Sequence, residues 1–366
     1  MRLSPAPTQT AALIAAISCL TATAFSQSAA TDPVGFVTMQ VAAAPVGGDQ
    51  LSYRALSLSR AVEYQAAAEV AANSGANSIL TDNQATWTDN QFNPVGATAD
   101  TATYYLEIVR PPGQATAAPG EGTTYDVLAT NAAGKTVTLA GNLPAGVVGS
   151  ASVSFKLRKY WTIGDVFGVT NQAGLGAGAQ GEADDVLIYS PQNNQFNAYY
   201  YRLGGIGGSS WRNSNTGADA TSQKIYPEDG ILIRRRQTSA VNVLLMGSVK
   251  LGTTSSAVVS GVNFLGNIYA ADMTLGSSNL YTGDSNTGVL GGAQGEADDV
   301  LIYDQATRAY KTYYYRIGGI GGSGWRSSDD GSVATTVGVP TGSSIVVRRR
   351  GATGFNWVAP QHPASL

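Results

Sequence analysis

The sequence contains very little cysteine and histidine, with one residue of each among 366. Cys19 lies in an apolar run that we expect to be removed from the mature chain, and His362 lies in the C-terminal stretch APQHPASL. A mature chain without cysteine has no disulfides, no thiolate nucleophile and no cysteine-based metal site. A single histidine near the C-terminus also excludes a multi-histidine zinc site and argues against a histidine-dependent catalytic triad.

Charge is scarce as well. Charged residues make up 13% of the chain, about half of the ~25% that is typical of globular domains. The formal net charge is −3, and removal of Arg2, the only charged residue before Asp32, would make it −4. Nucleic-acid binding needs a basic surface, so this class of partner is excluded. The 44 glycines and 18 tyrosines are typical of extracellular β proteins that pack against neighbours or sugars.

Long hydrophobic runs are missing, apart from one near the N-terminus. Ala11–Phe25 is apolar but shorter than the ~20 residues of a membrane helix, and the small residues of Ala24–Ser26 fit a cleavage site. We therefore predict a signal peptide over residues 1–26, with cleavage after Ala30 or lipid attachment at Cys19 as less favoured alternatives. The prediction is an exported protein without membrane insertion, at the cell surface, in the outer envelope or outside the cell, with the periplasm as an alternative.

One stretch of twelve residues, GAQGEADDVLIY, occurs twice, at 178–189 and at 292–303. The offset of 114 residues also relates two copies of YYYR, two Trp-Arg pairs and two arginine triplets, 234–236 and 348–350. A period of 114 is too long for a solenoid repeat, so it indicates two copies of a domain-sized module. Short apolar runs separated by glycine, proline and asparagine predict that both copies consist of β-strands.

A weaker likeness relates the segments that begin at Gly35 and Gly247, with an offset of 212. Because 212 exceeds 114 by 98, we expect an insertion of about that length in the first module. The predicted fold is all-β, with two similar β-sandwich or barrel modules, the first interrupted by an inserted small β-barrel domain. The predicted domains are a signal peptide (1–26), module one (27–64 and 161–246), the insert (65–160), and module two with a short C-terminal tail (247–366). Residues 61–73 are the one segment with helical propensity, and could be a short helix or the start of the insert.

Several motifs together resemble a family of uncharacterised exported proteins of verrucomicrobial-type bacteria. They are TDPVGFVT, YWTIGDVFG, ADDVLIY, YYYRIGGIGGSGWR, IRRR and GFNWVAP, and they cover nearly all of the mature chain. The resemblance implies export and a largely β fold. It implies no established activity and no catalytic residues.

The repeated acidic cluster is the first candidate site, and it consists of Glu182, Asp184 and Asp185 with their copies Glu296, Asp298 and Asp299. Adjacent aspartates on a strand point to opposite faces, which argues against a pair of catalytic carboxylates. Calcium is an alternative, because it binds carboxylate and backbone oxygens in glycine-rich loops. The interpretation that we favour is pairing with the arginine triplets that end the neighbouring strand.

The second candidate site is the aromatic and glycine-rich run that follows, with Tyr200, Arg202 and Trp211 and their copies Tyr314, Arg316 and Trp325. Exposed tyrosine and tryptophan beside arginine could stack on sugars, or anchor a protein contact. The structural alternative, to which we give more weight, is core packing with cross-strand tyrosine pairs.

The sequence therefore predicts an exported, non-enzymatic structural or adhesive protein that acts through repeated Tyr/Trp/Arg surfaces. Its expected partners are further copies of itself or other surface proteins, and the only cofactor considered is calcium. The alternative is a carbohydrate-binding protein that captures polysaccharide. A carboxylate-dependent glycan-active enzyme is a third, less favoured hypothesis.

Overall fold

The structure is a computed structural model that describes residues 32–191 and 193–360. The predicted signal peptide, Cys19 and His362 lie outside these ranges. Within them the chain is all-β, as predicted, with a single helix of five residues, α1 (Ile163–Phe167). No helix of the described ranges has the length and apolar character needed to cross a membrane.

A five-stranded antiparallel sheet contains the first copy of the repeated stretch. Its strand order is β13-β12-β11-β15-β2. Ile231 and Ile233 point into one core while Leu232 points into another, so both faces of the sheet are covered, as the uninterrupted apolar run predicts. The strands are β2 (Gln50–Ala55), β11 (Asp185–Ser190), β12 (Gln195–Arg202), β13 (Ser210–Asn213) and β15 (Gly230–Arg235).

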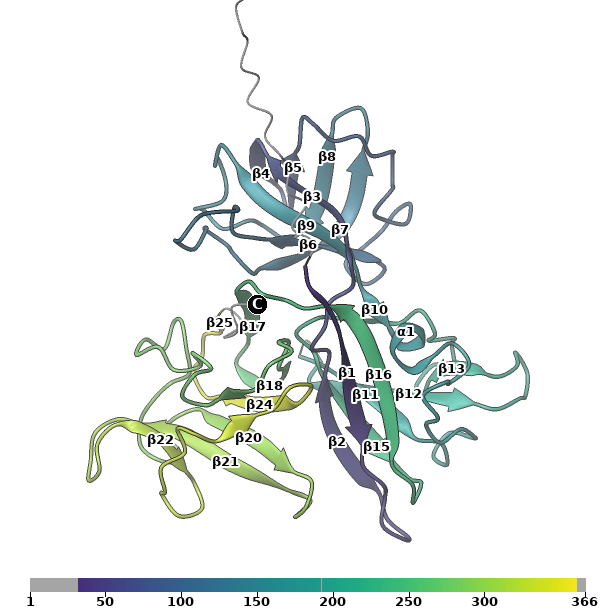
Figure 1. Cartoon of the computed structure of the whole chain (residues 1–366), viewed down its shortest axis with the longest axis vertical. Coiled ribbons are helices and arrows are strands. Elements are labelled where there is room, and N and C mark those ends of the chain that lie inside the picture. Colours follow the sequence, from purple (N-terminus) through teal and green to yellow (C-terminus); the bar gives the residue numbers. More distant parts are fainter. Residues whose placement is uncertain (1–31, 192, 361–366) are drawn as a thin grey trace, which may run out of the picture. The chain divides into compact units, whose positions relative to one another are not determined.

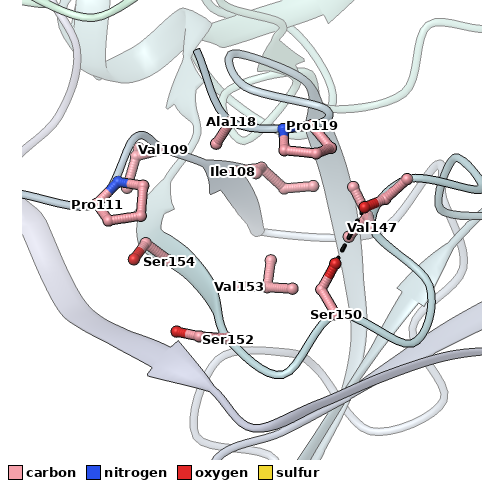
Figure 2. Close-up of a pocket in the computed structure, with 11 residues that line it drawn as sticks. Ile108, Val109, Pro111, Ala118, Pro119, Val147, Ser150, Ser152, Val153 and Ser154 are labelled. Carbon is pink, nitrogen blue, oxygen red and sulfur yellow. Dashed lines mark hydrogen bonds between the residues drawn. The ribbon is translucent and has the colours of Figure 1, made fainter. Parts of the chain in front are cut away.

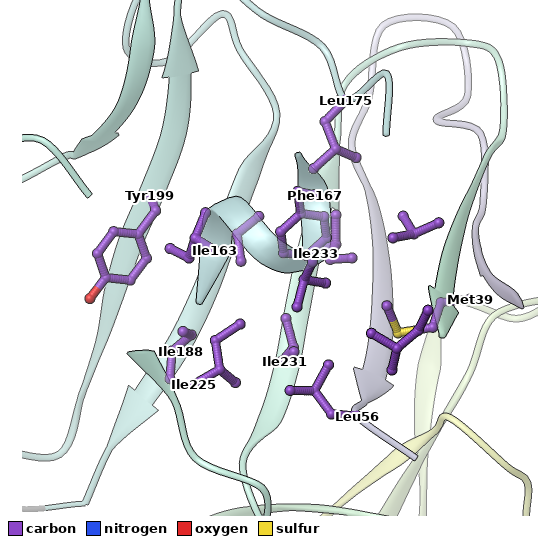
Figure 3. Close-up of a cluster of buried hydrophobic side chains, with 14 of the residues drawn as sticks. Met39, Leu56, Ile163, Phe167, Leu175, Ile188, Tyr199, Ile225, Ile231 and Ile233 are labelled. Carbon is purple, nitrogen blue, oxygen red and sulfur yellow. The ribbon is translucent and has the colours of Figure 1, made fainter. Parts of the chain in front are cut away.

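A two-stranded ribbon packs on the inner face of this sheet, and its strands β1 and β16 run side by side (Figure 1). Figure 3 shows part of the shared core, where Phe167 of α1 lies among isoleucines of the sheet. Helix α1 begins where Thr162 and Asp165 form a reciprocal capping box. The elements are β1 (Val34–Val41), β16 (Val241–Ser248), β10 (Trp161–Thr162) and β14 (Lys224–Ile225).

The second copy forms a five-stranded sheet with the corresponding order, β18-β24-β20-β21-β22. A ribbon of β17 and β25 accompanies it, as β1 and β16 accompany the first sheet. The domain border that the sequence places at 246/247 falls within β16, which pairs with β1. The strands are β17 (Thr254–Val258), β18 (Gly261–Gly266), β19 (Met273–Thr274), β20 (Asp299–Asp304), β21 (Ala309–Arg316), β22 (Gly324–Ser327), β23 (Gly338–Val339), β24 (Ser344–Arg349) and β25 (Phe355–Ala359).

Residues 62–159 form a separate seven-stranded antiparallel sheet, in the order β3-β9-β6-β7-β8-β5-β4. The alanine-rich segment 61–73 contains strands and not a helix, because pairing with β9 and β5 overrides its local propensity. The domain boundaries themselves stay a prediction. The strands are β3 (Val62–Ala68), β4 (Val70–Ser74), β5 (Asn77–Thr81), β6 (Tyr104–Ile108), β7 (Thr124–Asn131), β8 (Thr136–Ala140) and β9 (Val153–Lys159).

The two five-stranded sheets contact each other through equivalent surfaces. Tyr53 and Leu232 of the first sheet share an apolar cluster with Val346 of the second, and aromatic rings of both sheets surround them. The aromatic residues of this cluster include Tyr53, Phe196, Phe264 and Tyr303.

Two reciprocal hydrogen bonds cross this contact. The amide of Ala55 donates to the carbonyl of Gly342 (3.0 Å), and the amide of Gly266 donates to the carbonyl of Glu228 (2.9 Å). The donors are equivalent positions of β2 and β18, 211 residues apart, and the acceptors are 114 apart. The two modules therefore contact each other reciprocally through the same surface, as the two subunits of an isologous dimer do.

Glu228, next to this contact, makes stability depend on pH. Burial raises the pKa of Glu228 from 4.5 to about 7, and the charge of Asp126 adds to the shift. Between pH ~4.3 and 7 the Glu228 carboxyl therefore keeps its proton in the folded chain and releases it in the unfolded chain. The free energy of unfolding falls as the pH rises through this range. We expect Glu228→Gln to flatten the fall of the melting temperature between pH 5 and pH 8, measured by calorimetry. The exposed substitution Glu182→Gln is the control, and an equal slope in both variants would contradict the assignment.

Candidate functional site

The repeated aspartates are ion-paired with the arginine triplets, which confirms the interpretation favoured from the sequence. The carboxylate of Asp184 pairs with the guanidinium of Arg235, and both side chains are almost completely buried. Its second oxygen accepts the backbone amide of Arg236 at 2.7 Å. In the second copy Asp298 pairs with Arg349 at 2.7 Å and accepts the amide of Arg350 at 2.7 Å.

The neighbouring aspartate pairs with the two outer arginines of each triplet. Asp185 accepts from Nε of Arg234 and from Nη2 of Arg236, each at 2.8 Å. In the second copy Asp299 accepts from Arg348 at 2.7 Å and from Arg350 at 2.8 Å. Strand alternation explains the pattern, because the middle arginine points to one face of the strand and its neighbours to the other.

These contacts leave the aspartates little capacity for other chemistry. A carboxylate has about four lone-pair sites. Asp184 and Asp298 each accept three charged or backbone donors and are almost completely buried, so a substrate or a cation has little access to them. Glu182 and Glu296 are exposed and lie outside the ion pairs of the described residues. No group of three or more metal-ligating side chains occurs in the described parts of the chain. Calcium binding at these carboxylates stays a prediction.

The tryptophans are core residues, which contradicts their candidate role on an exposed binding surface and agrees with the core packing given more weight from the sequence. Trp211 has an exposed fraction of 0%, and its indole nitrogen donates to the carbonyl of Gly168 at 2.8 Å. It packs against Phe167 and Tyr201. Strand alternation correctly gives two faces, but Trp211 lies on the face that α1 and the ribbon cover.

The second copy repeats this arrangement. Trp325 is buried and packs edge-on against Tyr315. Tyr200 and Tyr314 are also buried, so the tyrosines of the predicted platform are not available to a sugar either. Core packing, the structural alternative, is the role of both tryptophans. Tyr200 and Tyr314 are buried without being members of these two core clusters.

Arg202 and Arg316 hold the glycine-rich loops that follow them. The guanidinium of Arg202 donates to the carbonyls of Ile206 and Gly208, and Arg212 donates to the carbonyl of Gly207 at 2.8 Å. The second loop has the same contacts, from Arg316 to Ile320 and Gly322 and from Arg326 to Gly321. We call each pair of arginines a clamp.

The loop backbone explains why the sequence needs glycine there. Gly204, Gly205, Gly207 and Gly208 all have positive φ, between 62° and 86°, and the four glycines 318, 319, 321 and 322 repeat this conformation. Residues with a Cβ adopt it at a cost, so glycine is the favoured residue. Because two glycine pairs flank a single isoleucine, that side chain is left at the tip of the turn.

The loops expose large apolar side chains, which the sequence analysis missed. Ile206 and Ile320 have exposed fractions of 98% and 97%, and Leu203 and Ile317 are also exposed. We call Leu203 with Ile206, and Ile317 with Ile320, the apolar loop tips. Hydrophobicity alone predicts burial for isoleucine. The signal that could have revealed them is the pattern GGIGGS, in which no neighbouring side chain can cover the isoleucine.

A shallow pocket lies in the seven-stranded part, between Ile108, Val147 and Val153 (Figure 2). Its polar groups are serine hydroxyls, and the Ser150 hydroxyl donates to the carbonyl of Gly146 at 3.0 Å. Among the described residues that line it, none is ionisable, so it offers no acid, base or charged nucleophile.

We expect loss of either buried aspartate charge to destabilise the chain. Asp184→Asn or Asp298→Asn leaves a buried arginine without its counter-charge, which costs about 3–5 kcal/mol of unfolding free energy. Urea unfolding measures the loss. The control is Glu182→Gln, at an exposed position outside the ion pairs of the described residues, for which we expect a change within about 0.5 kcal/mol. A loss below about 1 kcal/mol in both aspartate variants would show that these pairs do not anchor the modules.

The chain matches no family model, and comparisons with curated proteins and with solved structures give no match. The inference of function therefore depends on what the described side chains can contact.

Proposed function

We propose that this chain is an exported, non-enzymatic structural or adhesive protein that acts by contact through its two apolar loop tips. The observation that carries the proposal is the almost complete exposure of Ile206 and Ile320 on loops that arginine clamps hold in place. The sequence prediction placed the contact on tyrosine, tryptophan and arginine, and the proposal moves it to the loops that the arginines hold.

Exposed isoleucine provides the free energy for such a contact. Complete burial of one isoleucine side chain against a partner contributes about 1.5–3 kcal/mol. The clamps fix the loop backbone in advance, so that little conformational entropy is lost on binding. Two tips in one chain also allow bivalent attachment, in which the second contact follows at a high effective concentration.

The other functions considered from the sequence stay predictions. The carbohydrate-binding alternative loses its expected stacking surface, because Trp211 and Trp325 are buried. A carboxylate-dependent glycan-active enzyme would need acids other than the four paired aspartates. Export and the resemblance to exported bacterial proteins are compatible with an adhesive role and are part of the proposal.

Replacement of both tip isoleucines should weaken attachment without changing the fold. We expect the double variant Ile206→Ser, Ile320→Ser to bind isolated cell envelopes at least about tenfold more weakly than the original chain, since each lost isoleucine contact is worth roughly a factor of ten. Sedimentation with envelopes measures binding, and the melting temperature should stay the same because both side chains are exposed.

The matched control replaces two other exposed apolar residues, Val46 and Val95, with serine. These valines lie in turns outside the clamped loops, so this variant should bind as the original chain does. Equal binding by both double variants, or no binding by the original chain, would contradict the proposed function.

A further inference from the structure

The outer face of the β1–β16 ribbon exposes a second apolar surface, far in sequence from the loop tips. Phe36 lies directly opposite Met246, and Leu244 lies opposite Thr38 in the next outward-facing pair. The four large apolar residues of this face are Val34 (76% exposed), Phe36 (73%), Leu244 (58%) and Met246 (63%). We call them the ribbon patch.

The opposite side of the same ribbon already closes the core of the first module. Met39, Val41, Val243 and Leu245 alternate with the patch residues and are buried beneath the ribbon. Packing of the module therefore does not need large apolar residues on the outer side. The patch has to be explained by something that covers it from outside.

The second module provides an internal comparison. In its ribbon the outward-facing pairs are Ser255 with Val358 and Ala257 with Asn356. Of these four residues one, Val358, is a large apolar side chain, and it is 40% exposed. The same fold thus forms with an outer face that carries little apolar surface. The ribbon patch therefore occurs in the first module alone of the two, and the shared fold of the modules does not require it.

We propose that the ribbon patch is covered by the ribbon patch of a second copy of this chain, face to face about a two-fold axis. This self-association uses a different surface from the loop tips. The strands β1 and β16 contain no charged residue, so two copies bring no like charges together. Among the described residues the two strands form a two-stranded sheet, which a single bridge between Ser248 and Ser59 extends at one end. Neither strand carries the lysine or proline that commonly protects free strand edges.

The size of the patch fits a two-fold dimer. Its four side chains expose on the order of 500 Å², given ~150–250 Å² for a large side chain. Two patches together supply on the order of 1,000 Å², which is the lower limit for a specific interface. The two modules of the chain already pack sheet on sheet through equivalent surfaces, so the fold tolerates this mode of contact.

Sedimentation velocity of the purified protein over a range of concentrations tests the proposal. We expect a dimer, and we expect Phe36→Thr with Met246→Thr to raise the dissociation constant at least tenfold while the melting temperature is kept. Threonine preserves strand propensity at both positions. In the matched control, Ala257→Thr with Asn356→Thr on the ribbon of the second module, the dimer should persist unchanged.

The outcomes separate this inference from the proposed function. A dimer that persists in Ile206→Ser, Ile320→Ser but dissociates in the ribbon variant supports the ribbon patch, whether or not the loop tips bind envelopes. A monomer at all concentrations, or a dimer that the ribbon substitutions do not weaken, overturns it. A monomer that binds lipid vesicles through Phe36 and Met246 also overturns it and assigns the patch to a membrane surface.

Discussion

The buried ion pair between the first aspartate of the repeated stretch and the middle arginine of the triplet is the constraint on which each module depends. In the first copy Asp184 accepts amides from Gly176 and Arg236 in addition to the charge of Arg235, so one carboxylate joins a loop, the start of β11 and the end of β15. A buried pair of this kind adds little net stability, but breaking it is costly, so it discriminates against other registers. Its neighbour Asp185 lies opposite Arg234 in the strand pairing and holds the same register from the other face.

Comparison of the two modules shows which residues both copies share and which surface residues differ between them. Both copies keep the aspartates, the arginine triplet and the clamped glycine loop, and these are the parts that form interlocked contacts. The outer faces of the two ribbons differ, since one carries Phe36 and Met246 and the other carries Ala257 and Asn356. The loop tips are therefore a shared feature of both modules, whereas the ribbon patch distinguishes the first.

Much of the fold could be predicted from local patterns, because strand alternation and the 114-residue offset place aspartates opposite arginines without any structure. For Trp211 the sequence favoured core packing but left an exposed surface open, since alternation says which residues share a face but not which face is covered. Strand formation in 61–73 depends on pairing with β9 and β5, which are distant in sequence. Exposure of Ile206 follows from four glycines with positive φ, a backbone property that outweighs the hydrophobicity of the side chain.

In the proposed function the clamped loops make the contact and the repeated acidic stretch serves as scaffold. Hydrogen–deuterium exchange of the protein, alone and bound to isolated cell envelopes, tests it most directly. We expect new protection in residues 203–209 and 317–323. We expect no change in 178–189 and 292–303, whose aspartates are already paired with arginines. New protection in the two acidic stretches, with the loops unchanged, would contradict it.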